Sequence, residues 1–586
     1  MNKFVVSLST IPPLINSLLE PRMISGQQGG SRWGDWKCRF NGFHHILALL
    51  MLLTLLPARS HANVYATNVR LNGGVTNIVA AAVTNLGISY TLNEPATLGV
   101  FININSGATA VRSITLTNPG PGTLQGSNYV AWDGLNNASN SVPGGVYTVS
   151  ITAASSGYTD WTETSSPTND FEYHIWEPRG IAVNRNTNSP YYGRVYVGNA
   201  NQGVDPLFHL GDLVGILKLN ADGTYAAEGG YSTGGYDWGH GAPEADGFSP
   251  WKLEVGPDDR VYATDFIDQG LVLSFDQLVS TNSLIAVLRV DNYPTNSLVN
   301  LESPFITGSP GNLQIWMADN SFNAGASGAG IHRWNLTAGG SVATNDTGLT
   351  VVQPGVSGGL DQAPKDVALD GNNHIYTIQD IEDQGALPWR VLRFPVFTNI
   401  TETNAEWRIG SGDDSMAGAS GIAVDPTGTY IAVTFKGFLD PQGFLENGSV
   451  RVFYASNGAP VITLGEGDQY DTAWDNVGNL YDADGFASRW RSYSPPGTNQ
   501  ATTVAIPIIQ IAAPTAPLLS NPSYAGAVGQ FQFALSGEAN ATYVILSSTN
   551  LVDWLPVVTN TSTLAIRQVT NNVAGGRTFF RARLGP

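Results

Sequence analysis

Cysteine is almost missing from this sequence of 586 residues, and charged side chains are scarce. The single cysteine, Cys38, lies ahead of an expected signal-peptide cleavage site. We therefore expect a mature chain with no disulfide, no thiolate nucleophile and no cysteine-bound metal. Lys and Arg (28) are outnumbered by Asp and Glu (47). Because a phosphate backbone attracts proteins of the opposite charge, no nucleic acid is expected as a partner.

Long apolar runs are also missing, apart from one near the start. Residues 46–56 form an apolar run of 11, about half the length that crosses a bilayer as a helix. Basic residues precede this run, and the small residues Ser60 and Ala62 follow it. This layout predicts a secretory signal peptide over residues 1–62, with Met23 as an alternative start. Its removal leaves 22 basic and 45 acidic side chains, a net charge of −23. We expect a protein without a membrane span that is secreted, either extracellular or at the cell surface.

Glycine, by contrast, is abundant (66 residues), and short alternating segments between turns are typical of an all-β protein. In residues 63–155 the segments at 88–95, 129–134 and 143–152 follow one another in this order. They resemble the strands of the Ig-like domain of flagellar hook-capping proteins. The resemblance implies a β-sandwich with a structural or adhesive role, with Trp132 and Tyr147 as core aromatics. Residues 156–175, rich in Ser and Thr, are expected to form a linker.

Residues 176–512 contain an internal repeat. Each copy reads as strand, tight Asp/Gly/Asn turn and strand, and the copies begin near residues 178, 250, 304, 364, 420 and 470. The copies at 249–265 and 303–319 align without a gap. An isolated sheet of this size cannot bury both faces, so six copies predict six blades packed around one axis. The repeat resembles the NHL-repeat and gluconolactonase-like class of six-bladed β-propellers, a fold that hosts both enzymes and binding proteins.

A smaller β unit is expected at residues 513–586, after a proline-containing boundary. On residues 548–554 and 579–582 it resembles a C-terminal module of secreted proteins from Verrucomicrobia-like bacteria, and Trp554 and Phe580 are expected in its core. The expected fold is therefore all-β: an N-terminal Ig-like β-sandwich, a six-bladed β-propeller and a small C-terminal β-sandwich.

The start of each innermost strand, near the proline of the repeat, is where a propeller forms a ligand site. Converging charges beside an aromatic ring could bind a small polar ligand such as a sugar, and the alternative is a channel mouth that is polar because water fills it. The candidate residues are Glu177, Arg179, Trp251, Lys252, Lys365, Asp366 and Asp471.

The resemblance to gluconolactonase-like enzymes also implies a divalent cation, held by a Glu of the first inner strand together with Asn and Asp from other blades. Glu177 is placed for the first ligand. The family's Pro-Asn-Gly segments are replaced here by residues 178–180 and 364–366. A cation beside Arg179 and Lys365 would be repelled, which argues against lactonase chemistry.

Two further acidic regions are weak metal candidates. One Gly-rich loop brings together Asp237, His240, Glu244 and Asp246, in a spacing that matches no metal signature. Acidic clusters at 413–414 and 466–471 leave calcium open as a cofactor, although stabilisation of turns is the simpler role. No other cofactor is expected, and the scattered histidines predict no catalytic triad.

Two functions of different classes follow from these observations. The first is a secreted or cell-surface binding or scaffold protein, in which the propeller presents a recognition surface to a carbohydrate, a protein or a surface polymer. The second is a metal-dependent, lactonase-like hydrolase or lyase that acts from the central channel. A structural envelope component is a third, weaker alternative.

Overall fold

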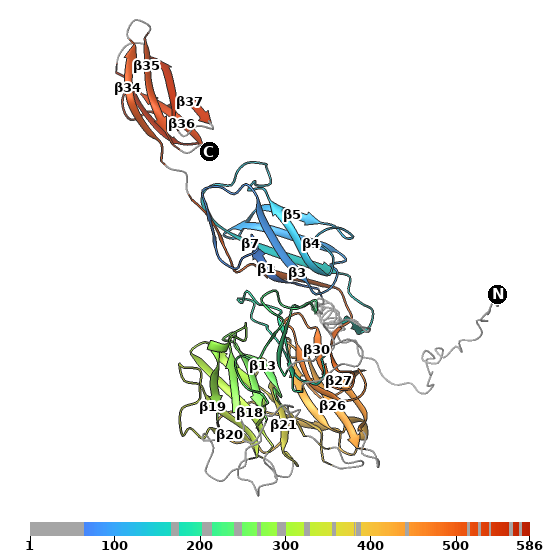
Figure 1. Cartoon of the computed structure of the whole chain (residues 1–586). Helices are drawn as coiled ribbons and strands as arrows, with labels where there is room; N and C mark the ends of the chain where they lie inside the picture. Colours follow the sequence, from blue (N-terminus) through green and yellow to red (C-terminus); the bar gives the residue numbers. More distant parts are fainter. Residues whose placement is uncertain are drawn as a thin grey trace, which may run out of the picture. The chain divides into compact units, whose positions relative to one another are not determined.

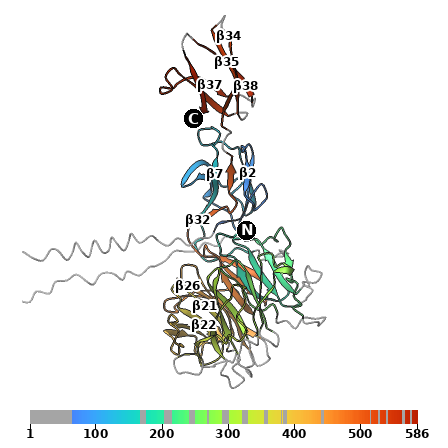
Figure 2. The ribbon, with the colours of Figure 1, turned by 90° about the vertical axis from the view of Figure 1, so that its left-hand side faces the viewer.

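A computed structural model describes most of the chain after residue 63 (Figures 1 and 2). Within the described residues there is no α-helix, only two single-turn 3₁₀ helices at Thr281–Ser283 and Asp414–Met416. The protein is therefore all-β in these parts, as expected. No helix there is long and apolar enough to cross a bilayer. The described residues are 64–165, 175–201, 214–239, 249–266, 271–289, 301–320, 329–353, 359–379, 381, 388–439, 445–512, 516–525, 529–537, 541–561, 566–573 and 577–585.

The Ig-like part is a sandwich of two sheets around one apolar core. Trp132 and Tyr147 are buried in that core with their rings 6.4 Å apart, as expected. The first sheet has the order β1(Ala66–Leu71)-β3(Leu86–Leu92)-β6(Gly126–Trp132), and the second the order β2(Ile78–Ala80)-β33(Ile509–Ile511)-β7(Gly145–Ser155)-β4(Gly99–Ser106)-β5(Thr109–Leu116).

The pairing of two segments differs from the expected domain ranges. β32(Asn499–Val504) and β33 both pair antiparallel with β7, so residues assigned to the end of the propeller complete the Ig-like sheet instead. The expected linker at 156–175 contains β8(Thr162–Glu163), which pairs with β31(Arg489–Ser494). Both segments are short, and their long-range partners cannot be inferred from alternation of apolar and polar residues.

Six four-stranded antiparallel sheets make up the propeller-type domain in the described residues. β22 lies beside β21, its partner in the fourth sheet, in Figure 2. In order they are β9(Pro178–Val183)-β10(Val195–Asn199)-β11(Gly215–Leu219)-β12(Tyr231–Ser232), β13(Leu253–Val255)-β14(Val261–Asp265)-β15(Leu271–Phe275)-β16(Ile285–Leu288), β17(Leu301–Ser309)-β18(Asn312–Asp319)-β19(Gly330–Asn335)-β20(Leu349–Val352), β21(Pro364–Leu369)-β22(Ile375–Gln379)-β23(Val391–Phe394)-β24(Trp407–Ile409), β25(Ala419–Val424)-β26(Tyr430–Leu439)-β27(Leu445–Tyr454)-β28(Pro460–Leu464) and β29(Gln469–Trp474)-β30(Leu480–Asp484)-β31-β8.

Apolar clusters lie between each pair of neighbouring sheets. One of them joins Ile181 and Val195 of the first sheet to Tyr481 and Trp490 of the sixth. The first strands also follow one another in sequence order, with β29 in contact with β9. Each sheet therefore buries both of its faces against its two neighbours, which an isolated sheet could not do.

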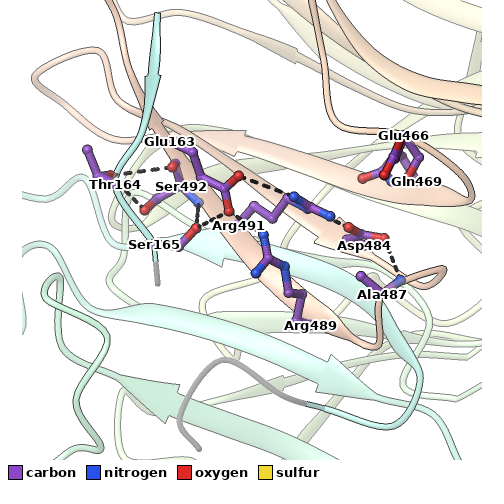
Figure 3. Close-up of polar contacts among 10 residues, drawn as sticks. All are labelled: Glu163, Thr164, Ser165, Glu466, Gln469, Asp484, Ala487, Arg489, Arg491 and Ser492. Atoms are coloured by element: carbon purple, nitrogen blue, oxygen red, sulfur yellow. Dashed lines mark hydrogen bonds and ion pairs between the residues drawn. The ribbon is translucent and has the colours of Figure 1, made fainter. Parts of the chain in front are cut away.

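β8, which precedes the first sheet in the sequence, is the outermost strand of the sixth sheet (Figure 3). It is only two residues long, and polar contacts reinforce it. Glu163 pairs with Arg489 and, at 3.2 Å, with Arg491. Arg491 in turn contacts the buried Asp484 at 2.5 Å. The N–H of Thr164 donates to the carbonyl of Ser492 at 2.8 Å. These contacts tie the two ends of the domain together.

The C-terminal module is a second small sandwich. Its core holds Phe533, Tyr543 and Ile545, with Phe580 packed against them. Trp554, expected in the core, lies outside this cluster and contacts the guanidinium group of Arg581. The sheets are β34(Leu518–Ala525)-β35(Gln530–Ser536)-β38(Ile566–Asn572) and β37(Leu555–Thr561)-β36(Thr542–Ser548)-β39(Phe579–Leu584).

Candidate functional site

The candidate site is built by the starts of the six first strands. In five of these strands the pairing with the second strand shifts by one residue at this point. The extra residue is Arg179 in β9, Lys365 in β21, Ser420 in β25 and Tyr470 in β29. Such β-bulges re-aim a side chain and are enriched beside functional sites. We call the residues at this position the mouth ring: Arg179, Trp251, Glu302, Lys365, Ser420 and Tyr470.

Arg179 lies at the centre of the contacts in the mouth ring. Its guanidinium carbon is 3.8 Å from the centre of the Tyr470 ring and 5.4 Å from the centre of the Trp251 ring. It also forms an ion pair with Glu177, the residue expected as a metal ligand. A guanidinium group held by two aromatic faces and a carboxylate is an ordered arrangement, because each contact restricts its orientation. The structure thus brings Glu177, Arg179 and Trp251 together.

Glu302 anchors the other side of the mouth ring. Its carboxylate accepts hydrogen bonds from the indole N–H of Trp251 at 2.9 Å and from the amide of Asn320 at 3.1 Å, and Lys365 pairs with it at 2.9 Å. Glu302 is fully buried, whereas 18% of the Lys365 side chain is exposed. Buried charges persist when paired and hydrogen-bonded in this way. The mouth ring is therefore a connected network.

One residue further along each strand, a second set of groups links neighbouring sheets and, through Lys252, the second sheet to the sixth. Lys252 donates to a carboxylate oxygen of Asp471 at 3.1 Å and to the carbonyl of Tyr470. The other oxygen of Asp471 accepts from the N–H of Ile181 at 2.8 Å. A carboxylate oxygen of Asp366 accepts a hydrogen bond from the N–H of Ile422 at 2.8 Å. We call the residues at this position the inner ring: Gly180, Lys252, Ser303, Asp366, Gly421 and Asp471.

Glycine is required at two positions of the inner ring by the close approach of neighbouring strands. A Cβ added at Gly180 would lie 2.7 Å from the carbonyl oxygen of Trp251. A Cβ added at Gly421 would lie 2.9 Å from the Cα of Asp471. The bare backbone at these positions lets the adjacent carboxylates reach across to a neighbouring strand.

Three carboxyl groups on the first strands, Glu254, Asp366 and Asp471, have raised pKa values. Burial raises the pKa of Asp366 to about 7, against a lowering by Lys252 and a further rise caused by Asp471. Burial likewise raises the pKa of Asp471. Glu254 lies two residues after Lys252 along the chain. Burial raises its pKa to about 8, and the positive charge of Arg185 opposes this rise. Lys252 lowers the pKa values of Asp366 and Asp471, against the larger effect of burial.

The cavity that the first strands enclose is small. Residues of all six first strands line it, among them Glu254, Asp366 and Asp471, and its volume is about 50 Å³. That volume holds a few water molecules. Pockets for small organic ligands span roughly 300–1,000 Å³. A sugar therefore does not fit inside this cavity, which none of the mouth-ring residues line.

The metal candidates outside the channel have different outcomes. His240, Glu244 and Asp246 lie outside the described residues, so the predicted metal loop stays a prediction, and Asp237 alone of the four is described. Asp413 accepts a hydrogen bond from the N–H of Ser415 at 3.0 Å, at the start of a 3₁₀ turn, which is a turn-stabilising role. Among the described residues no three His, Cys, Asp or Glu side chains gather in a metal-binding group.

Sequence reasoning missed Tyr470, Glu302 and Glu254. The β17–β18 hairpin extends to the pair Ser309–Asn312 and is longer than the β13–β14 hairpin. Because the gapless alignment of the second and third repeats ignores this extra length, it did not place Glu302 opposite Trp251. The strand registers place Glu302, not Phe305, at the position of Trp251. Tyr470 directly precedes Asp471, and comparison with the residues preceding Asp366 and Gly180 would have found it.

Comparisons with known proteins cover the two larger parts of the chain. Residues 76–157 match the FlgD Ig-like domain. None of the curated proteins matches the chain. Similar solved structures include a protein of unknown function from Bacteroides thetaiotaomicron (12% identity, TM-score 0.36, 76% of this chain and 99% of that one). Others are the periplasmic gluconolactonase of Pseudomonas aeruginosa (10%, 0.27, 70% and 99%) and a puromycin hydrolase (11%, 0.27, 66% and 62%). At these TM-scores the likenesses say nothing about activity.

Proposed function

We propose that the chain is a secreted or cell-surface binding and scaffold protein that recognises an extended carbohydrate across the mouth ring. In this proposal the six sheets are the blades of a six-bladed β-propeller of the NHL-repeat class, and the flanking sandwiches act as spacer and attachment modules. The observation that carries the proposal is the mouth ring itself, a connected network of charged and aromatic groups above a cavity of about 50 Å³.

The exposed edges of the network provide the contacts. About a fifth of the side chains of Glu177 (22%) and Lys365 (18%) remains exposed, and Tyr470 is half-buried. A polymer lying over these groups can exchange hydrogen bonds with a carboxylate and an ammonium group while a sugar ring contacts the tyrosine. Because the network is already ordered, binding would cost little side-chain entropy.

The test is affinity electrophoresis of the purified chain through gels that contain single polysaccharides. We expect at least one polysaccharide to retard the protein, and Tyr470→Ala to abolish the retardation. Tyr454→Ala is the matched control, because Tyr454 is an exposed tyrosine (43%) outside the mouth ring. Retardation by none of the polysaccharides, or hydrolysis of lactones or esters at enzyme-like rates, would overturn the proposal.

A metal-dependent hydrolase or lyase acting from the channel is the second candidate. The observation in its favour is the group of channel carboxyls with raised pKa values, Glu254, Asp366 and Asp471, because such groups gather at catalytic sites. Against it, the ammonium group of Lys252 already occupies the space beside Asp471. Elemental analysis of the purified chain and of its Glu177→Gln variant distinguishes the two: a bound metal that is lost on substitution favours the enzyme.

A further inference from the structure

The C-terminal module differs in charge from the rest of the chain. Residues 513–586 contain four arginines and two acidic residues, a net charge of +2. Residues 63–512 contain 18 basic and 43 acidic side chains, a net charge of −25. A small basic module joined to a large acidic body is a feature of interaction modules that bind anionic partners.

Two of the four arginines lie on the same face of one strand. Arg581 and Arg583 alternate with core residues along β39 and are exposed, pairing in register with Leu546 and Val544 of β36. Within the described residues no ion pair joins Arg577, Arg581 or Arg583 to an acidic side chain. The guanidinium carbon of Arg581 lies 4.2 Å from the centre of the Trp554 ring.

An apolar turn lies directly beside these arginines. Leu551 (55%) and Val552 (77%), in the connection from β36 to β37, and Leu555 (69%), the first residue of β37, are largely exposed. The turn is well defined: the side-chain oxygen of Asn550 accepts from the N–H of Val552 at 3.0 Å and from that of Asp553 at 2.9 Å. The indole N–H of Trp554 donates to the carbonyl of Leu551 at 3.1 Å. The turn therefore holds its apolar side chains in solvent.

We infer that this apolar–basic patch, made of Leu551, Val552, Leu555, Trp554, Arg581 and Arg583, docks on the surface of an anionic lipid bilayer. Exposed Leu and Val side chains next to Trp and Arg are what interfacial segments use: the apolar groups enter the boundary between headgroups and acyl chains, and the cations bind lipid phosphates. A carbohydrate would use the arginines but leave the protruding aliphatic turn without a role.

The net negative charge of residues 63–512 opposes docking only where those residues come close to the bilayer. Repulsion between exposed charges and the bilayer is screened beyond about 8–10 Å at physiological ionic strength. Only charges within about this distance of the bilayer surface contribute appreciably to the free energy of binding. The inference goes beyond the proposed carbohydrate binding, which uses residues of the propeller-type domain, and either proposal can fail while the other holds.

The experiment is co-sedimentation of the full chain with vesicles of phosphatidylcholine and phosphatidylglycerol in equal parts, and with vesicles of phosphatidylcholine alone. We expect binding to the anionic vesicles that high salt reverses, and much weaker binding to the neutral ones. Each arginine near an anionic surface strengthens binding about fivefold, so the double variant Arg581→Gln/Arg583→Gln is expected to bind roughly 30-fold more weakly. Val552→Asp is expected to reduce binding as well.

Matched controls keep the test specific. Arg333→Gln/Arg408→Gln removes the same two charges from arginines that also stack on aromatic rings, and Ile400→Asp changes an aliphatic side chain that is 70% exposed, both in the propeller-type domain. These variants should bind like the original chain, and circular dichroism checks that every variant is folded. No binding to anionic vesicles, or equal loss in the control variants, would overturn the inference, as would retention by an anionic polysaccharide without binding to vesicles.

Discussion

Replacing Lys252 by methionine would leave the carboxyl groups of Asp366 and Asp471 without the positive charge that they share. The Lys252 and Asp471 side chains are only 1% and 6% exposed, and their charged atoms are 3.1 Å apart. Removing one partner of a buried ion pair costs about 3–5 kcal/mol, because the remaining charge stays desolvated. At about 2 °C per kcal/mol for a domain of this size, the unfolding temperature should fall by about 6–10 °C.

The loss should depend on pH. The pKa of Asp366 is about 7 in the folded chain, above the ordinary value of 3.8. A raised carboxyl pKa makes the folded state bind more protons, so stability falls as pH rises from the unfolded pKa through the folded one. Without Lys252 this pKa rises further. We therefore expect Lys252→Met to cost little near pH 5, where protons neutralise the carboxyl groups, and the full amount near about pH 8.

Scanning calorimetry of the purified chain across this pH range makes the measurement. The double variant Lys252→Met/Asp471→Asn should recover part of the loss, since it removes the unpaired carboxylate as well. Lys365→Met is the comparison, because its partner Glu302 keeps hydrogen bonds from Trp251 and Asn320. A loss below about 1 kcal/mol for Lys252→Met, or a loss that is the same at both pH values, would refute the reasoning.

Three further substitutions probe the same framework by thermal unfolding. Glu254→Gln should raise stability by about 4 kcal/mol more near pH 9 than near pH 5, because the pKa of about 8 makes ionisation of Glu254 unfavourable in the folded chain; an effect of the opposite sign would contradict its burial. Glu163→Gln should cost about 1–3 kcal/mol and speed proteolysis after β8, since two arginines lose their carboxylate; unchanged protease resistance would count against this closure. Gly421→Ala should cost about 1–3 kcal/mol through its clash with Asp471, whereas Gly371→Ala, with nothing within 4 Å, should be neutral; equal effects would argue against the close strand approach.

The strand content and the core aromatics of the Ig-like part could be predicted from the sequence because they follow local rules. Alternation of apolar and polar residues marks the strands, and glycine with asparagine or aspartate marks the turns. The position of Trp132 between such signals indicates a buried ring, and the structure buries it fully. The repeat beginning near residue 364 appears as the β21–β22 hairpin for the same reason.

The parts that the sequence does not predict depend on contacts between distant segments. β8 forms a strand by pairing with β31, more than 300 residues away, and Arg489 and Arg491 of β31 also hold Glu163. β32 and β33 return to β7 across a similar separation. At the candidate site, one-residue bulges shift the register at Lys365 and Tyr470. No local pattern marks such a shift, so the sequence predicted Arg179, Trp251 and Lys365, whereas the place of Glu302 beside them follows only from the paired strands.

The account rests on recognition over the mouth ring and not inside the channel. Calorimetric titration of the purified chain with a polysaccharide that retards it, in competition with the constituent monosaccharide, tests this most directly. Because a cavity of about 50 Å³ is too small for a sugar, binding over the mouth ring predicts that the monosaccharide fails to displace the polymer even in large excess. Displacement by the monosaccharide at a concentration similar to that of the polymer's sugar units would contradict the account.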